Sequence, residues 1–130
     1  MTLISVLLLY IAFRTKQFTC DFLLQNDWMA TNKGKPGMEG YKALFSHCLV
    51  HAAGTGLIAL LFAPALWWLA LVDLAIHSFV DRLKGMLTYE KGWKYTDRMF
   101  WWSFGLDQEA HNITHMAYLL LIVAHNGIVT

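Results

Sequence analysis

The chain has 130 residues, of which 57% are hydrophobic and only 15% are charged, and its formal net charge is +1. Soluble domains carry about 25% charged residues, so this composition favours a single membrane domain that covers residues 1–130. A basic surface of the kind that binds nucleic acid is not expected from this charge balance, which excludes nucleic acid as a partner.

The first hydrophobic segment is predicted to form a membrane-spanning helix over about residues 3–25. Its apolar residues precede Arg14 and Lys16, whereas a secretory signal peptide has its positive charges before the apolar core. A helix of about 23 residues is long enough for a hydrocarbon core of roughly 30 Å. Because Arg14, Lys16 and Asp21 must then face inward or extend to the interface, this is the weakest of the predicted spans.

Three further helices are predicted over about residues 41–62, 66–84 and 104–125. Glycine and Pro36 make residues 26–42 a loop, and Pro64 favours a tight turn between the second and third helices. Residues 85–103 mix aromatic and basic side chains, as expected of a segment that lies in the headgroup plane. The predicted fold is therefore all-α, a polytopic membrane bundle of four transmembrane helices with an interfacial amphipathic segment before the last helix.

The basic residues predict the orientation of this bundle. Eight of the ten lie in two loops on one side: Lys33, Lys35, Lys42, Arg82, Lys84, Lys91, Lys94 and Arg98. By the positive-inside rule both loops are cytoplasmic and both termini are outside. We therefore expect the protein in the bacterial cytoplasmic (inner) membrane, with the lipid bilayer as its first partner.

Every predicted helix carries polar residues that are spaced four apart, so that they share one helical face. The sets are Asp21 with Gln25, His47 with His51, Asp73 with His77 and Asp81, and Asp107 with His111 and His115. Ionisable groups at membrane depth are costly and are retained where they meet partners inside a bundle. In the predicted orientation most of them lie in the cytoplasmic half, which predicts one shared site; Asp73 and His115 lie deeper.

Imidazole with carboxylate is the ligand set of zinc, iron and manganese sites. His47 and His51 have the spacing of the zinc-protease helix motif, although Cys48 stands where that motif has its glutamate base. The candidate ligands are Asp21, His47, His51, His77, Asp81, Asp107 and His111. They exceed the four positions of one zinc ion, so we predict either two ions or one ion with residues that orient its ligands. His125, near the outer end, is expected to form a hydrogen bond across the bundle.

Four blocks of the sequence resemble, in order, a known family. They are DFLLQNDWMA at 21–30, HCLVH at 47–51, HSFVDRLK at 77–84 and LDQEAH at 106–111. This set is similar to a bacterial and phage family of integral membrane proteins that is described only as a domain of unknown function, numbered 3307. The resemblance implies a membrane protein and supplies no activity. The family commonly has a histidine four residues before the first aspartate, where this chain has Gln17.

The leading functional hypothesis is a metal-dependent hydrolase at the cytoplasmic face of the membrane. A divalent ion, zinc before iron or manganese, would lower the pKa of a water, and Asp81 or Asp107 would act as the base. Residues 89–104 would hold a membrane-associated ester, phosphoester or amide substrate. One alternative is a metal or proton transport or sensing element, which with four spans would have to oligomerise. Another is a structural or interaction protein, such as a phage product, in which the polar layer only pins the helices together.

Overall fold

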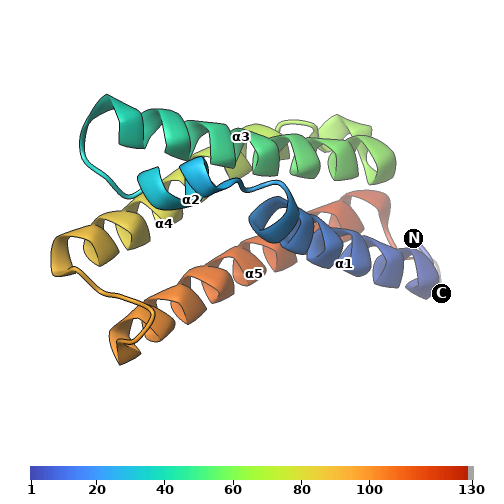
Figure 1. The fold of residues 1–130 in the computed structure, drawn as a ribbon. Helices are drawn as coiled ribbons and strands as arrows, with labels where there is room; N and C mark the ends of the chain where they lie inside the picture. Colours follow the sequence, from blue (N-terminus) through green and yellow to red (C-terminus); the bar gives the residue numbers. More distant parts are fainter. Residues whose placement is uncertain (129–130) are drawn as a thin grey trace.

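The computed structural model describes residues 1–128, and no strand occurs among them. The helices follow one another as α1 (Leu3–Phe18), α2 (Asp27–Asn32), α3 (Gly37–Phe62), α4 (Leu69–Lys91) and α5 (Arg98–Asn126) (Figure 1). A π-helical turn, η1 (Thr19–Leu23), extends α1, and a short 3₁₀ turn, η2 (Pro64–Leu66), precedes α4. The all-α prediction is confirmed.

Local side-chain bonds determine where the first helices begin. Thr2 caps α1 by accepting a hydrogen bond from the backbone N–H of Ser5 at 3.2 Å, and Asn26 caps α2 in the same way through Met29 at 2.9 Å. These caps satisfy backbone donors that a helix start leaves unpaired. Between the two caps the chain widens into η1, which contains Asp21. Single π-helical turns of this kind occur frequently at functional sites.

Three stretches of the described chain are long and apolar enough to cross a membrane: Leu3–Leu23, Gly37–Phe62 and Pro64–Lys91. Large apolar side chains are exposed along their outer faces, among them Leu3, Leu61 and Phe79. The interior, in contrast, contains twelve buried polar or charged residues within residues 1–128. A polar interior with an apolar exterior is the distribution expected of a bundle that is surrounded by lipid.

Packing divides the bundle into an apolar end and a polar end. α3 packs along α4, α4 packs against α5, and α1 contacts both α3 and α5 (Figure 1). The apolar core includes Leu9, Phe13, Leu69 and Ile122. The two chain ends meet at this side, where the amino group of Met1 donates a hydrogen bond to the carbonyl of Gly127. The polar layer described below therefore lies on the far side of this core from the termini.

Two predicted boundaries differ from those of the structure. Residues 85–103 are mostly helical, because α4 continues to Lys91 and α5 already begins at Arg98. No helix-breaking proline interrupts α4, which ends only where Gly92 takes a left-handed conformation with φ +65°. Similarly, residues 26–42, predicted as a loop, contain α2 and the start of α3 at Gly37. The turn predicted at Pro64 is confirmed by η2.

The link between α2 and α3 lies directly on α4. A Cβ atom placed on Gly34 would lie 2.4 Å from the carbonyl oxygen of Gly85, so only glycine permits this approach. Arg82 strengthens the contact, because its guanidinium donates hydrogen bonds to the carbonyls of Lys33 at 3.3 Å and Lys35 at 2.8 Å. The link is thus held in place by α4, and it brings Lys33 into the polar layer.

Candidate metal centre

The seven predicted ligands are brought together by four elements. Asp21 comes from η1, His47 and His51 from α3, His77 and Asp81 from α4, and Asp107 and His111 from α5. All except Asp21 are buried, and the Asp21 side chain is only 10% exposed. The helical spacing of four places each pair on the inward face of its helix, as the sequence predicts.

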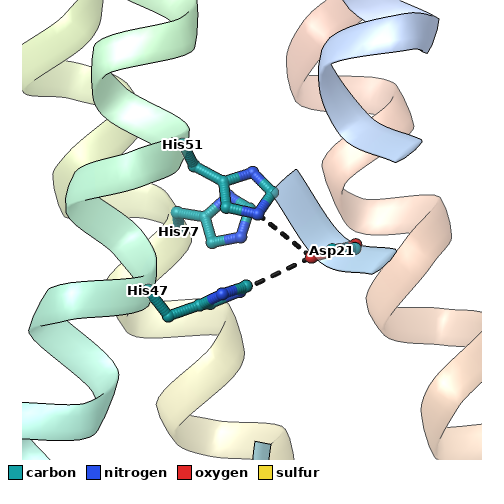
Figure 2. A group of neighbouring side chains, drawn as sticks. All are labelled: Asp21, His47, His51 and His77. Atoms are coloured by element: carbon teal, nitrogen blue, oxygen red, sulfur yellow. Dashed lines mark hydrogen bonds and ion pairs between the residues drawn. The ribbon is translucent and has the colours of Figure 1, made fainter. Parts of the chain in front are cut away.

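Asp21, His47, His51 and His77 form the first group that could hold an ion (Figure 2). Asp21 Oδ1 lies 3.0 Å from His51 Nε2 and 3.5 Å from His47 Nε2. One potential ligand atom from each of the four residues lies within 4.8 Å of all the others. A tetrahedral zinc ion with bonds of about 2.0–2.1 Å separates its ligand atoms by roughly 3.3 Å. The donors and their spacing therefore fit one ion.

His77, Asp81 and His111 form a second group that shares a histidine with the first. Asp81 Oδ1 lies 3.0 Å from His111 Nε2 and 3.6 Å from His77 Nε2. Its other oxygen, Oδ2, lies 3.1 Å from His47 Nε2. Because an imidazole nitrogen has a single lone pair, one nitrogen of His77 serves only one group at a time.

Three imidazole rings lie in contact across the bundle: His77 is stacked on His111 and tilted against His51. The ring centroid of His77 lies 3.8 Å from that of His51 and 3.7 Å from that of His111. His77 is 1% exposed, and neither of its ring nitrogens has a hydrogen-bond partner within residues 1–128. Buried polar atoms in proteins are nearly always paired. A cation among these nitrogens would satisfy them, so the donor set and its unpaired atoms both fit a metal ion.

Two lysines contact the carboxylates of the second group. Lys33 Nζ lies 2.7 Å from Asp81 Oδ2, and Lys84 Nζ lies 3.6 Å from Asp107 Oδ2. Burial by itself lowers the pKa of Lys33, but the adjacent Asp81 carboxylate outweighs it and raises the pKa above its usual value. Sequence reasoning missed both lysines as site residues. Lys84 could have been predicted, because it follows Asp81 by three residues and so lies on a similar face of the helix. The sequence around Lys33 gives no such signal, because Lys33 lies in a predicted loop.

Asp21 is held by neutral partners. The side-chain amides of Gln17 and Gln108 donate hydrogen bonds to its Oδ2 at 2.6 and 2.8 Å, which leaves Oδ1 facing the histidines. Gln17, four residues before Asp21, therefore orients the aspartate. Lys16 and Arg14, the nearest cations in the sequence, have other partners: Lys16 pairs with Asp73 and Arg14 donates to Asn112.

A second polar layer lies deeper in the bundle. Lys16 Nζ is 3.0 Å from Asp73 Oδ2 and 3.1 Å from His115 Nε2, and the hydroxyl of Thr55 donates to Asp73 at 2.9 Å. Asp73 and His115 are thus separate from the main layer, as the sequence predicts. The prediction for His125 is wrong, because this residue is exposed at the end of α5.

A cavity of about 490 Å³ lies beside the metal centre. Its polar residues include Asp21, Asp107, Gln108, Lys33, Lys35 and Lys84, and its aromatic residues are Phe22, Tyr89, Trp93, Phe100 and Phe104. Two of the candidate ligands therefore line the cavity, while the histidines and Asp81 lie behind them. The volume is in the range of about 300–1,000 Å³ that is typical of small-molecule sites.

Fold and site together define a helical protein with a buried histidine and aspartate centre and three helices that are able to span a membrane. The chain belongs to the family described as "Protein of unknown function (DUF3307)", whose profile matches residues 6–129. The family predicted from the four sequence blocks is thereby confirmed, and its description assigns no activity. No curated protein and no solved structure matches the chain.

Proposed function

We propose that the protein is an integral membrane enzyme, a hydrolase that depends on one divalent metal ion. His47, His51 and His77 hold the ion, together with Asp21. The observation that carries this proposal is His77, which is buried among three other imidazoles with both ring nitrogens unpaired. A histidine that served only helix packing would be expected to donate a hydrogen bond across the bundle.

The charges of the layer favour a single ion. Asp21, Asp81 and Asp107 contribute three negative charges, and Lys33 and Lys84 supply two positive charges directly against the last two. One divalent ion next to Asp21 leaves this buried layer with a single excess charge, whereas two ions leave three. Uncompensated buried charge is unfavourable, so we expect one ion. We expect it in the first group, because Asp21 is the carboxylate without a lysine partner among these three. Three imidazoles and a carboxylate are a typical ligand set of zinc.

The proposed membrane topology rests on the distribution of the basic residues. We propose that α5 crosses the bilayer as a fourth span beside the three apolar stretches, with both termini outside in a bacterial inner membrane. The link before α3 and the link after α4 contain Lys33, Lys35 and Lys94, and the adjoining parts of α3, α4 and α5 contain Lys42, Arg82, Lys84, Lys91 and Arg98. Figure 1 shows both links at the end of the bundle opposite the termini. Fusions of alkaline phosphatase to Thr130 should be active, and fusions after Lys35 should be inactive. The reverse pattern would overturn this orientation.

For the reaction, a bound divalent ion lowers the pKa of water towards neutrality and so provides a nucleophile. Of the two predicted bases, Asp107 lines the cavity, and its buried Oδ1 lies 3.3 Å from His111 Nε2 without forming a hydrogen bond in the described chain. Asp107 therefore accepts the proton. Asp81 lies behind it, paired with Lys33, and its two oxygens lie 3.1 Å from His47 Nε2 and 3.0 Å from His111 Nε2.

The shape of the bundle favours hydrolysis over transport. The cavity reaches the centre from the side of Lys33 and Lys84. On the opposite side the paired Lys16 and Asp73 and then the apolar core close the bundle. A transporter needs access to its site from both sides of the membrane in turn.

Elemental analysis of the purified protein tests the proposal before any substrate is known. We expect about one zinc per chain and loss of hydrolysis after chelation, measured on a panel of ester, phosphoester and amide substrates. The His47→Ala/His77→Ala double variant should lose both the bound zinc and the hydrolytic activity, while His125→Ala should retain both. A metal-free protein with unchanged folding would indicate a structural role. Metal uptake by reconstituted vesicles without hydrolysis would indicate transport, and either result would overturn the proposal.

A further inference from the structure

The cavity beside the metal centre has one charged end and one aromatic wall. Asp21, Asp107 and Lys84 lie at the charged end, next to the proposed ion. The wall is formed by aromatic side chains: Phe22, Trp93, Phe100 and Phe104. A pocket with a few placed polar groups and a mostly apolar lining binds ligands that combine both characters.

The cations at this end are not equally available to a ligand. Lys33 is tightly paired with Asp81 at 2.7 Å. Lys84 is more loosely paired, at 3.6 Å from Asp107, and Lys35 donates to the neutral side chain of Asn32 at 2.9 Å. Two lysines of the lining are therefore able to meet an anion, and lysine binds phosphate as a compact point charge.

The charged side chains of the cavity lining carry a net positive charge, and a bound ion would increase it. Its lining has three lysines and two aspartates, of which Asp21 is used by the proposed ion. The ammonium of Lys84 also lies 5.4 Å from the ring of Phe104, so a cation adjoins the aromatic wall directly. The other side of the wall reaches the outer surface, where Phe22 is 57% exposed. A ligand therefore meets a cationic end and an apolar wall that leads to the outside of the bundle.

We propose that this cavity binds a phosphate ester of an apolar alcohol, with the phosphate at Lys35 and Lys84 and the apolar part along the aromatic wall. This substrate class rests on the proposed function. In the hydrolysis of a monoester the water oxygen forms a bond to phosphorus as the P–O bond to the alcohol breaks. The proton accepted by Asp107 passes to the departing alkoxide, and the products are the alcohol and inorganic phosphate.

Binding is measured separately from hydrolysis with octylphosphonate, whose P–C bond water does not cleave. Titration calorimetry of the zinc-loaded protein in a neutral detergent compares it with octanol and with inorganic phosphate. We expect octylphosphonate to bind at least about tenfold more tightly than either, because each of the others lacks one half of the interaction. Competition by zwitterionic vesicles with and without phosphatidic acid then distinguishes a membrane lipid from a soluble phosphate ester as the source.

Variants on one helix identify the phosphate position. Lys84→Gln should weaken octylphosphonate binding about tenfold, and Lys84→Arg should largely restore it. Lys91→Gln is the matched control, because Lys91 belongs to the same helix and is exposed outside the cavity. If Lys84→Gln does not fold, Lys35→Gln tests the same phosphate position, and it should also weaken octylphosphonate binding.

Two results would overturn the substrate class: octanol binding as tightly as octylphosphonate, or the lysine variants of the cavity behaving like Lys91→Gln. Neither result would change the zinc content or a metal-dependent hydrolysis of other substrates. Absence of zinc from the purified protein would instead overturn the proposed function itself. The two failures are therefore distinguishable in one preparation.

Discussion

Replacing His77 with leucine should leave stability nearly unchanged in the absence of metal and lower it clearly in the presence of zinc. In the ion-free protein the substitution removes two buried nitrogens that have no hydrogen-bond partner. Relief of unpaired polar burial contributes about 1–3 kcal/mol. The loss of contact with the rings of His51 and His111 costs about 0.5–1.5 kcal/mol for each ring. These two contributions are of similar size and oppose each other, so the free energy of unfolding should change by no more than about 2 kcal/mol.

With zinc bound the same substitution removes a ligand. Zinc binding to a four-ligand site is worth about 10–16 kcal/mol, so one ligand accounts for roughly 3 kcal/mol and about two orders of magnitude in affinity. Thermal unfolding in detergent, with chelator and with excess zinc, measures both cases. The His77→Leu variant should match the unsubstituted protein in chelator and unfold at a clearly lower temperature in zinc.

The matched control is His125→Leu, because His125 is exposed at the end of α5 and should respond in neither condition. Equal destabilisation of His77→Leu with and without zinc would refute the reasoning. It would mean that the imidazole stabilises the bundle by packing alone. The comparison therefore separates ion binding from helix packing without any knowledge of the substrate.

Further predictions concern the parts that surround the centre. Gly34→Ala should displace the link from Gly85 and lower activity and stability, whereas Gly105→Ala, with nothing within 4 Å of the added methyl group, should be tolerated in the same unfolding and activity assays. Lys16→Met should destabilise by about 3–5 kcal/mol because it leaves Asp73 buried without its cation, and adding Asp73→Leu should recover most of that loss in chemical unfolding. Removal of metal by dialysis should abolish turnover, and zinc should restore it; turnover that persists in metal-free protein would contradict the proposed chemistry.

Helical periodicity predicted most of the site because the pairs are local. His47 and His51 on α3 share a face at a spacing of four, and so do Asp107 and His111 on α5. Ionisable side chains are unfavourable in contact with lipid, so those on several apolar helices turn inward. They therefore come together inside the bundle. The seven side chains therefore come together as the sequence predicts, while their roles as ligands and base remain proposals.

What the sequence did not reveal depends on contacts between distant segments. Lys33 reaches Asp81 only because the link after α2 crosses α4 at two glycines, and nothing local marks it. The extent of α4 to Lys91 was also missed, since basic and aromatic residues in a helix can line a cavity as well as lie at a membrane surface. The sequence also could not decide whether Asp81 or Asp107 is the proposed base, because this depends on which carboxylate lines the cavity.

The pair of Lys16 and Asp73 joins positions that are 57 residues apart in the chain. During synthesis the first helix therefore emerges well before its counter-ion exists, with an ammonium group that hydrocarbon disfavours. In the proposed topology we expect this segment to insert fully only after α4 has been made. Assembly of the N-terminal helix is thus coupled to the later hairpin, and a truncated product that ends before Asp73 would leave the segment exposed to quality-control proteases.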